Sequence, residues 1–479
     1  MNKAIWWIRR DLRLKDNQAL ALAMSAARQV SPVFVIDPRL VNSTYSSGKR
    51  LAFLFEGLRS LDASMKTRGS YLIVRRGDPA GQLATLLTET GADQIFAEED
   101  YSPFAVQRDS RIKTSLPITF TQGLTVHHPL DVVKSDGSPY TVFTPFSRSW
   151  LNLPAPKTTD ILPAPEHIRT PPGIASESLP ESPRLVEGSL FPASSLEAER
   201  RLIAFLDDSI SGIYAYKETR NRPDLDGTSG LSPYFRFGLI SARQAAVTAF
   251  SAIQEAPDAA AAASAQTWLN ELIWREFYQS ILYHYPFVRT HSFRQEFRQI
   301  RWQNDPDDFH AWCEGKTGYP IVDAAMRQLR TTGWMHNRSR MIVASFLTKD
   351  LLIDWQWGET WFMQHLVDGD PAANNGGWQW TAGVGTDAAP YFRIYNPILQ
   401  SQKFDPNGSY IRQYVPELKS VPDEFIHEPW KMPIAIQHKT GCLIGTHYPS
   451  PIIDHNWARA RTLSAYSLSK QSPISSRDL

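Results

Sequence analysis

The sequence predicts an α/β N-terminal domain with a Rossmann-like parallel sheet, followed by a larger all-α domain. In the first 100 residues, short apolar runs alternate with helical patterns, and helical periodicity then dominates from about residue 200 to about residue 420. Alternating strands and helices are typical of a parallel sheet covered by helices on both faces. A chain of 479 residues, 42% of them hydrophobic, also favours two domains.

The N-terminal elements follow one another in a regular order. We expect strands at 3–8, 33–36, 71–74 and 94–97, and helices at 18–27, 50–67 and 81–90. No Gly-x-Gly-x-x-Gly follows the first strand, so a standard dinucleotide site is not supported there. Nine of the 34 prolines lie between Pro154 and Pro192, which indicates a surface linker. The predicted boundaries are 1–130 for the α/β domain, 131–200 for the linker and 201–479 for the helical domain.

Composition narrows the class of protein. The net charge is +1, so any contact with DNA requires a local basic patch instead of bulk charge. The two cysteines, Cys313 and Cys442, form no close pair and no metal-ligand spacing, which fits a reducing cytoplasm and no bound metal. The first apolar run stops at Arg9 and Arg10 and is neither a signal peptide nor a membrane span.

One predicted helix carries an unusual polar and aromatic face between residues 268 and 285. Glu271, Trp274, Arg275 and Tyr278 are spaced i, i+3, i+4 and i+7, so they share that face. A core-facing stripe would consist of leucine and isoleucine. By spacing alone, however, an ordinary amphipathic helix with a Glu–Arg surface pair is the better interpretation.

A second face lies between residues 333 and 341. Asn337, Arg340 and Met341 share it. An amide and a guanidinium fork suit a planar heteroaromatic ligand or a carboxylate. A helix N-terminal region with basic surface residues explains the spacing equally well, so both interpretations stay open.

The sharpest pattern covers residues 367–380, VDGDPAANNGGWQW. Asp370 and Pro371 predict the N-cap and first residue of a helix, on which Asn374 and Trp378 lie one turn apart. Glycines 376 and 377 cost roughly 1 kcal/mol each inside a helix, which indicates that a ligand ring approaches the backbone closely. A capped helix with a glycine kink is the weaker alternative.

A fourth pattern, TSGLSPY at 228–234, places hydroxyl groups and a glycine before an expected helix. Such a segment suits phosphate. An ordinary Ser/Thr cap remains the alternative.

Together these segments resemble the photolyase and cryptochrome family, most closely its microbial (class I) cyclobutane pyrimidine dimer photolyases. The similarity runs from WWIRRDLR at 6–13 to YIRQYVPEL at 410–418, and is closest over 315–329, 333–354 and 368–396. The resemblance implies a lyase that repairs pyrimidine dimers in DNA under blue light. An electron would pass from photoexcited reduced FAD to the flipped-out dimer and then return.

The resemblance also implies the residues of an FAD site in the helical domain. They are Tyr216, Thr228, Ser229, Ser232, Asn337, Arg340, Asp368, Asp370 and Asn374. Asn374 would face flavin N5 with a neutral amide and act in catalysis. Trp302, Trp355 and Trp378 match the chain that carries an electron from the protein surface to the flavin. Ten of the 15 tryptophans lie between 268 and 380, so their density alone does not single out these three.

The residues that the resemblance assigns to the lesion and to DNA lie in the same motifs. Trp274 and Trp380 would clasp the dimer, because stacking offsets the cost of flipping by about 1–3 kcal/mol per base. Glu271 and Asn337 would hydrogen-bond the pyrimidine edge, with Glu271 catalytic, and Met341 would make an apolar contact. The expected phosphate contacts are Arg220, Arg275, Arg338 and Arg393.

A second, light-harvesting chromophore is common in this family. In the members that use folate, an Asn-Glu pair stands where this sequence has Phe104 and Ala105. Arg50 and the pattern Tyr-Ser-Pro at 101–103 are more similar to members that use a deazaflavin. We therefore expect a deazaflavin or another flavin in preference to folate, with Arg50 as an antenna residue.

The main alternative is a cryptochrome-type blue-light sensor without repair activity. Trp274, Met341, Asn374 and the lack of a long C-terminal extension favour repair. A repairer of (6-4) photoproducts uses histidines near the lesion, where the motif of this sequence differs. An aminoacyl-tRNA synthetase would carry a His-x-Gly-His signature, and this sequence contains none. We expect a monomer with damaged DNA as its partner, without membrane association or an obligate protein partner. Its expected location is the cytoplasm, on the bacterial nucleoid when bound to DNA.

Overall fold

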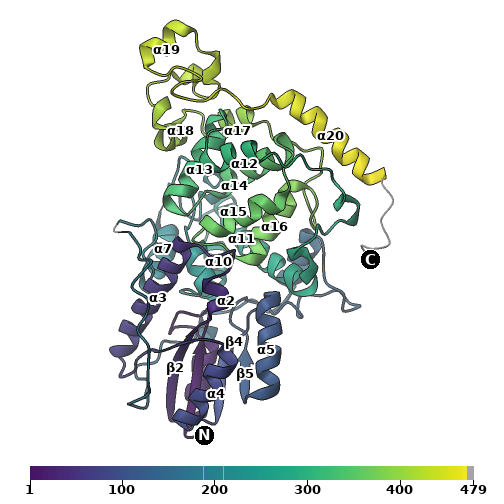
Figure 1. Ribbon diagram of the computed structural model, residues 1–479. Coiled ribbons are helices and arrows are strands. Elements are labelled where there is room, and N and C mark those ends of the chain that lie inside the picture. Colours follow the sequence, from purple (N-terminus) through teal and green to yellow (C-terminus); the bar gives the residue numbers. More distant parts are fainter. Residues whose placement is uncertain (187, 209, 472–479) are drawn as a thin grey trace. The chain divides into compact units, whose positions relative to one another are not determined.

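The computed structural model describes residues 1–186, 188–208 and 210–471 (Figure 1). Within these residues the chain forms two compact units, each built from separate stretches of sequence. Unit 1 comprises Met1–Lys217, Thr228–Pro286 and Val367–Ala372, and unit 2 comprises Glu218–Gly227, Phe287–Leu366 and Ala373–Leu479.

A parallel sheet forms the core of unit 1. Among the described residues its strands are β1 (Lys3–Ile8), β2 (Gln29–Ile36), β3 (Ile73–Arg76), β4 (Gln94–Glu98) and β5 (Ile118–Thr121). They are ordered β3-β2-β1-β4-β5, and every neighbouring pair is parallel. The central strand β1 is buried from its second residue onward, because helices cover both faces of the sheet.

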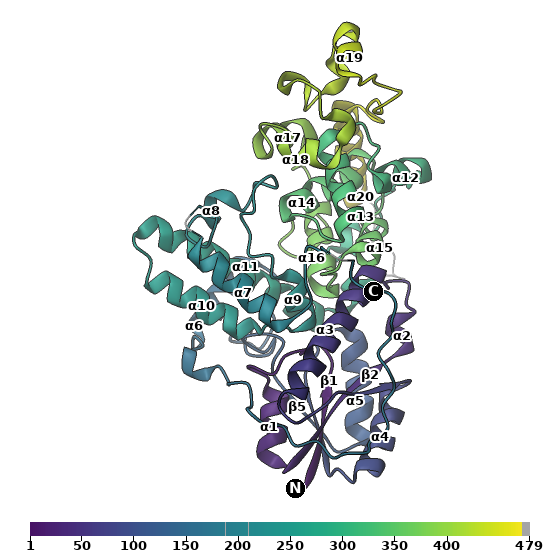
Figure 2. The ribbon, with the colours of Figure 1, turned by 90° about the vertical axis from the view of Figure 1, so that its left-hand side faces the viewer.

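Capped helices flank this sheet. They are α1 (Gln18–Ala26), α3 (Gly48–Lys66), α4 (Pro79–Thr90) and α5 (Pro103–Ser115). Figure 2 shows α1 on one side of the sheet and α4 and α5 on the other. Each begins where a side chain accepts from a backbone N–H, namely Asn17, Ser47, Asp78 and Ser102. The predicted α/β fold is thereby confirmed. The sequence analysis missed β5 and α5.

Further helices complete unit 1. They are α2 (Pro38–Val41), α6 (Phe143–Asn152), the 3₁₀ helix η1 (Thr158–Asp160), α7 (Ser195–Asp207), α8 (Tyr216–Thr219, which continues into unit 2), α9 (Ser232–Phe237), α10 (Ala242–Gln254) and α11 (Ala259–His284). The alanine-rich residues 259–265 form the first turns of α11, and Asp258 caps this helix.

The segment 131–200 belongs to unit 1 and is hydrogen-bonded to residues of the sheet domain. The N–H of Val30 donates to the carbonyl of Arg169 at 2.8 Å, and that of Ile168 to Arg68 at 2.9 Å. Ile168 is only 1% exposed. The segment also contains α6, so it combines a helix with extended stretches that lie along the sheet domain.

Unit 2 is helical. Its elements are η2 (Pro286–Arg289, which begins in unit 1), η3 (Gln295–Phe297), α12 (Pro306–Glu314), α13 (Pro320–Thr332), α14 (Asn337–Ser345), the π-helix η4 (Phe346–Asp350), α15 (Trp355–His365), α16 (Pro371–Ala382, which also begins in unit 1), α17 (Pro397–Phe404), α18 (Ser409–Tyr414), η5 (Pro416–Leu418), η6 (Asp423–Phe425), η7 (Pro429–Lys431), α19 (Ile434–Thr440) and α20 (His455–Gln471).

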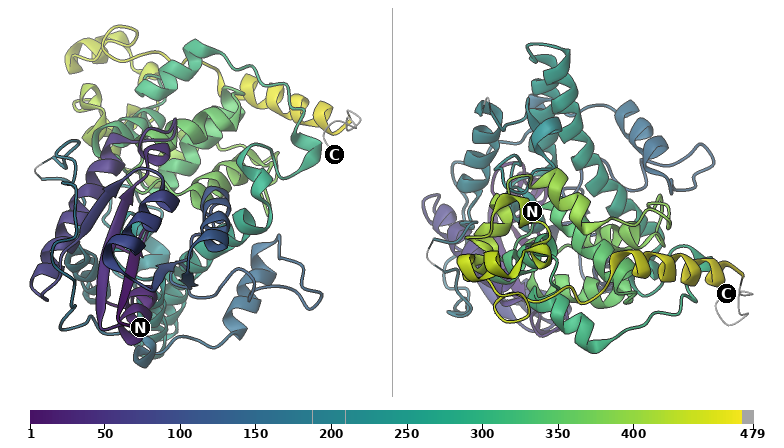
Figure 3. Two further views of the ribbon diagram at one scale, coloured as in Figure 1. Left: turned by 60° about the horizontal axis from the view of Figure 1, so that its bottom comes forward. Right: turned by 90° about the horizontal axis from the view of Figure 1, so that it is seen from above.

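The yellow helix α20 in Figure 3 packs on η3 and η4. Lys349 and Asp350 in η4 are fully buried. The ammonium of Lys349 donates to the carbonyl of Ala382 at 2.7 Å, and Asp350 pairs with His455 of α20 at 2.5 Å. The helix continues to residue 471, and residues 472–479 lie outside the described part of the chain.

The strand order indicates where unit 1 places functional groups. The chain runs from β1 outward through β2 to β3, and then returns to β4 on the other side of β1. Ligands of open parallel sheets bind beyond the carboxyl ends of the strands at such a reversal. Separately, none of the helices in the described residues is long and apolar enough to span a membrane.

Candidate functional site

The residues predicted from sequence are divided between the two units. Unit 1 holds Arg50, Tyr216, Thr228, Ser229, Ser232, Glu271, Trp274, Arg275, Asp368 and Asp370. Unit 2 holds Arg220, Trp302, Asn337, Arg338, Arg340, Met341, Trp355, Asn374, Trp378, Trp380 and Arg393. The geometry is therefore described within each unit.

A buried charge cluster lies at the reversal of the sheet in unit 1. Arg10 follows β1 and Asp100 follows β4. Arg10 binds Asp370 through Nη2 at 2.5 Å and lies 3.5 Å from Asp100 through Nη1. Burial opposes the charge on Arg10, but Asp370 and Asp100 together raise its pKa. Asp370 also accepts from Gln279 Nε2 at 3.1 Å and from the N–H of Ala372 at 2.9 Å, so it caps α16 as the sequence predicted.

Three more arginines surround the same carboxylates. Burial lowers the pKa of Arg236 to about 9 and that of Arg50 to about 10, although Asp370 acts against both shifts. Arg236 Nε donates to the carbonyl of Gly369 at 2.7 Å. Burial also lowers the pKa of Arg275. We call this group the arginine cluster: Arg10, Arg50, Arg236 and Arg275, with Asp100, Asp368 and Asp370.

The arginine cluster carries more cationic than anionic groups. Four guanidiniums face three carboxylates, and three of the four pKa values are lowered. A lowered pKa means that burial destabilises the cation. An anionic group bound here would offset that penalty. The sequence analysis missed Arg10, Arg236 and Asp100, because only the strand order shows that the ends of β1 and β4 are adjacent.

The hydroxyl residues of the predicted phosphate segment lie at and before α9. Ser232 is the exposed first residue of this helix, and Thr228 and Ser229 are half-buried. Tyr216 in α8 is 8% exposed and contacts Phe205 edge-to-face at 5.8 Å. All four residues belong to unit 1, on α8, on α9 and in the segment before α9.

The face predicted on residues 268–285 exists as part of α11. The Trp274 ring stacks on Phe143 with 3.7 Å between centroids and 4° between planes, and its centroid lies 5.6 Å from that of Tyr278. Arg275 Nη1 donates to the carbonyl of Leu124 at 2.9 Å. Glu271 and Trp274 are half-buried.

In unit 2, the three residues predicted to share a helical face, Asn337, Arg340 and Met341, all lie on α14, which begins at Asn337. Asn337 is exposed, and its Nδ2 contacts Met341 Sδ at 3.9 Å. Arg340 Nε donates to the carbonyl of Met335 at 2.8 Å, and Arg338 Nη2 donates to Asn221 at 2.6 Å.

The amide of Asn374 is oriented by a neighbouring helix. Its Nδ2 donates to the carbonyl of Glu359 in α15 at 3.0 Å. Since the donor side is engaged, the Oδ1 atom remains to accept a hydrogen bond; no described residue donates to it. One turn along α16, a Cβ at Gly377 would have no described atom within 4 Å outside its own stretch of helix. This part of α16 thus offers an acceptor and open space.

The three predicted tryptophans belong to the aromatic core of unit 2. Trp355 and Trp378 are each 2% exposed, whereas Trp302 is half-buried at the edge of that core. Trp378 meets Phe362 at 5.0 Å and Trp312 at 6.1 Å between centroids. Burial therefore decreases from Trp378 and Trp355 to Trp302. Trp380 is half-buried and Arg393 and Arg220 lie at least partly at the surface.

Gly358 in α15 explains how Trp378 packs. A Cβ at this glycine would lie 2.0 Å from the Trp378 ring, closer than any real contact. The Gly358 position carried no signal in the sequence, because the ring that fills it comes from another helix.

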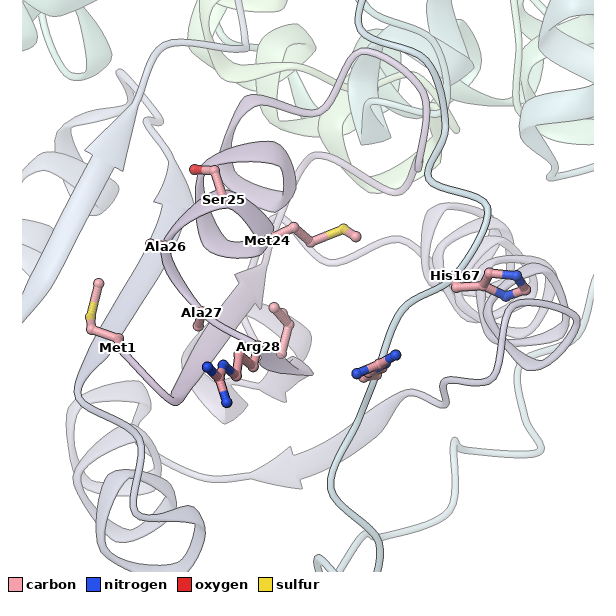
Figure 4. Close-up of a pocket in the computed structure, with 9 residues that line it drawn as sticks. Met1, Met24, Ser25, Ala26, Ala27, Arg28 and His167 are labelled. Atoms are coloured by element: carbon pink, nitrogen blue, oxygen red, sulfur yellow. The ribbon is translucent and has the colours of Figure 1, made fainter.

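The structure holds two further features away from these residues. Figure 4 shows a cavity of about 520 Å³ at the amino ends of β1 and β2, lined by Met24, Arg28, His167 and others, which includes no predicted site residue. At the positions of the folate ligands, Phe104 is 37% exposed and Ala105 is buried. No cluster of three metal-ligating side chains occurs in residues 1–186, 188–208 and 210–471.

Known families match most of the chain. The model of the DNA photolyase family matches residues 4–166, and that of the FAD binding domain of DNA photolyase matches residues 268–468. A deoxyribodipyrimidine photo-lyase of Alkalihalophilus pseudofirmus is 40% identical over 481 residues, which cover 97% of each chain.

Solved structures of the same kind share the fold. A class III photolyase from Agrobacterium tumefaciens has a TM-score of 0.91 and 36% identity over 98% of each chain. A Synechocystis cryptochrome has a TM-score of 0.87 and 28% identity over 97% of this chain and 99% of its own. A Sulfolobus tokodaii photolyase with two FAD molecules has a TM-score of 0.79 and 32% identity. The match covers 97% of this chain and 100% of the Sulfolobus chain.

Proposed function

This chain belongs to the DNA photolyase family, and we propose that it is a deoxyribodipyrimidine photo-lyase that repairs pyrimidine dimers in DNA under blue light. The proposal combines full-length similarity to a protein of that name with the FAD-binding family match over residues 268–468. The class I assignment remains a prediction, since a class III photolyase shares the fold at a TM-score of 0.91.

The residues present fit FAD. The observation that carries this most directly is Asn374, whose amide is fixed through Nδ2 by Glu359 so that Oδ1 can accept from a protonated ring nitrogen such as flavin N5. The open space at Gly377 suits a flat ring close to the backbone. In unit 1, the cationic excess of the arginine cluster suits an anionic cofactor. Reduced FAD would supply, on absorbing blue light, the electron that opens the cyclobutane ring.

The residues of this chain would then hold the lesion and the DNA. Trp274 and Trp380 would stack on the flipped dimer, and flipping costs least for a base that already pairs poorly. Glu271 would hydrogen-bond the pyrimidine edge and stabilise the radical anion, and Asn337, exposed on α14 beside Met341, would hydrogen-bond the same edge. Phosphate contacts are assigned to Arg220, Arg275, Arg338 and Arg393.

Trp378, Trp355 and Trp302 would form the electron path through unit 2. The decrease in burial from Trp378 and Trp355 to Trp302 supports this order, because the last member must reach solvent or an external donor. The remaining aromatic rings around Trp378 give it a dry environment. Replacing Trp302 by Phe is expected to stop photoreduction of the flavin while leaving repair by chemically reduced enzyme intact.

For the antenna, a deazaflavin or another flavin remains the proposal. The Sulfolobus protein with two FAD molecules supports a flavin in this role. Arg50 stays the proposed antenna residue, and its buried guanidinium interacts electrostatically with Asp368 and Asp370. The monomeric state, the absence of a protein partner and a cytoplasmic location on the nucleoid remain predictions from the sequence.

The second candidate function is a cryptochrome-type light sensor without repair. The observation in its favour is the Synechocystis cryptochrome, which shares the fold with a TM-score of 0.87. The two functions predict the same bound flavin and differ in the fate of the dimer.

The deciding experiment incubates the purified FAD-bound protein with an oligonucleotide that contains one cyclobutane dimer, with and without blue light. Loss of the dimer is measured by restored cleavage at a restriction site spanning it. We expect loss only in the light. Retention of the dimer in the light, with FAD bound and reduced, would leave the sensor function.

Glu271→Ala is the companion variant, with Glu197→Ala as the matched control. Glu197 is an acid in the first turn of α7 that pairs with Arg200 and Arg201. We expect the Glu271 variant to repair at least tenfold more slowly with normal FAD content, and the control to repair normally. A variant that purifies without FAD would show that Glu271 is structural.

A further inference from the structure

An unusually close ring contact supports Trp274 from within unit 1. The Phe143 and Trp274 rings are 3.7 Å apart between centroids and inclined by only 4°. Aromatic pairs in proteins usually lie 4.5–7 Å apart, in offset or edge-to-face arrangements. Phe277, which is fully buried, meets both rings at steep angles, at 5.5 Å from Trp274 and 5.9 Å from Phe143. The indole is therefore covered on one face and confined on another side.

Phe143 is held by a helix that is fastened to α11 at three points. Residues 143, 146 and 150 are spaced i, i+3 and i+7, so they lie on one face of α6. Phe143 stacks on Trp274, and Phe146 contacts Phe277 at 5.2 Å. Trp150 extends this face by one more turn.

The third point is polar. Trp150 Nε1 donates to Glu276 Oε2 at 2.7 Å, and the other carboxylate oxygen of Glu276 accepts from the N–H of Val126 at 2.5 Å. Glu276 is 4% exposed. A buried carboxylate with several donors is costly to disconnect. Phe143 thus belongs to α6, a helix that these contacts fix against α11.

This arrangement has a consequence for how Trp274 binds a base. An indole has two faces, and a protein ring that covers one of them leaves a single face for stacking. A side chain that is already immobilised loses less conformational freedom on binding, which increases affinity. Phe143 would supply that immobilisation, because its ring lies face-on against the indole.

We propose that Phe143 is a positioning residue, which holds the Trp274 indole in the plane required for stacking on the flipped pyrimidine dimer. The proposal rests on the proposed function, which assigns Trp274 to the lesion. Phe143 makes no contact with DNA or FAD in this account and acts only through Trp274.

The test compares Phe143→Leu, which keeps an apolar side chain but removes the ring, with Phe143→Tyr, which keeps the ring. Dissociation constants are measured in the dark, at one salt concentration, for the FAD-bound protein with a dimer-containing duplex and with the same duplex undamaged. We expect Phe143→Leu to weaken lesion binding about fivefold to tenfold and to leave the undamaged duplex unaffected. Phe143→Tyr should stay within twofold of the parent for both. Repair per bound complex should be unchanged in both variants, so the effect falls on KM.

Phe146→Leu is the matched control. It removes a ring from the same face of α6 that contacts Phe277 and not Trp274. We expect it to lower thermal stability while lesion affinity stays within twofold. A loss of lesion affinity equal to that of Phe143→Leu would show that both act by loosening α6, and would overturn the positioning role.

A double-mutant cycle separates the positioning role of Phe143 from the assignment of Trp274 to the lesion. In a Trp274→Ala background, Phe143→Leu should have no further effect on lesion binding, because its route of action is gone. An additive effect would overturn the proposal. Unchanged lesion binding by the Phe143→Leu single variant would also overturn the proposal. Tighter lesion binding by this variant would overturn it as well, because it would show that Phe143 competes with the base for the indole face. If Trp274→Ala itself binds the lesion normally, the assignment of Trp274 under the proposed function fails instead.

Discussion

In unit 1 the candidate site is built from buried charges, whereas in unit 2 it is built from buried aromatic rings and one amide. The arginine cluster of unit 1 joins Arg10, Arg50, Arg236 and Arg275 to three aspartates at the reversal of a parallel sheet. In unit 2, Trp355 and Trp378 lie in an apolar core and Asn374 bonds to a backbone carbonyl.

The two groups of residues differ in what stabilises them. Buried cations with lowered pKa values are destabilised until an anion arrives, so unit 1 should gain stability on binding one. The rings around Trp378 depend on packing, although burial also lowers the pKa of Lys349 and of His336 elsewhere in unit 2. Variants at the arginine cluster should therefore be sensitive to charge, and variants around Trp378 should be sensitive to shape.

The largest expected effect tests the charge side of the comparison. Arg10→Leu breaks the ion pairs with Asp370 and Asp100, whose side chains are only 12% and 14% exposed, and breaking a pair of this kind costs about 3–5 kcal/mol in the free energy of unfolding. Urea unfolding followed by tryptophan fluorescence measures it. Arg184→Leu is the control, since Arg184 and its partner Glu181 have side chains that are 67% and 91% exposed, and it should cost less than about 1 kcal/mol. Equal losses would contradict a special role for the cluster.

The second prediction places a titrating group in unit 2. Burial first, and then Arg338 and Arg340, lower the pKa of His336 to about 4. The folded protein keeps this imidazole neutral, while the unfolded chain takes up its proton near the ordinary value of 6.5. The stability that results is present above pH 6.5 and is lost as the pH falls toward 4. At 1.36 kcal/mol per pKa unit, the loss is roughly 3 kcal/mol.

His336→Asn tests this, because an asparagine can replace Nδ1 as the cap that accepts from the N–H of Arg338. Urea unfolding at pH 7 and at pH 4 should show a smaller acid loss in the variant than in the parent. His310→Asn, a histidine whose side chain is 73% exposed, should retain the parental loss. An unchanged acid loss in the His336 variant would place the titrating group elsewhere.

The third prediction tests shape in unit 2. Gly358→Ala brings a Cβ to 2.0 Å from the Trp378 ring and should cost about 1–3 kcal/mol through overpacking. Displacing Trp378 should also slow photoreduction of bound FAD. Gly81→Ala in α4, where a Cβ meets nothing within 4 Å, is the control and should not lower the melting temperature. Normal stability and photoreduction in the Gly358 variant would show that the ring shifts freely.

The smallest effect separates stability from cofactor binding. Gly377→Ala in α16 should raise the free energy of unfolding of the FAD-free protein by about 0.5–1 kcal/mol, because alanine favours helix and the added Cβ has open space. If a flavin ring approaches this backbone, FAD content after purification falls in the same variant. Normal FAD content, measured from the absorption spectrum, would show that the glycine serves no ligand.

Much of the fold followed from periodicity. The apolar runs predicted β1 to β4, and Asp370 with Pro371 predicted the start of α16, because both signals are local. β5 was not predicted, because it is a short strand at the sheet edge and is only half-buried after its first residue. The C-terminal helix α20 was missed because its buried partners, Asp350 and Lys349, lie more than 100 residues earlier.

By itself, the sequence determined which helical faces crowd polar and aromatic groups, and its resemblance to photolyases named the cofactor and the lesion. Those conclusions depend on the spacing of residues along one helix or on the order of motifs, and both can be read directly from the amino-acid sequence. Only the tertiary structure decided that Arg10 and Asp100 meet at the sheet reversal, that Gly358 makes room for Trp378, and that Phe143 covers one face of Trp274. Each of these contacts joins segments that are distant in sequence, so it exists only once the strands are ordered and the helices are packed.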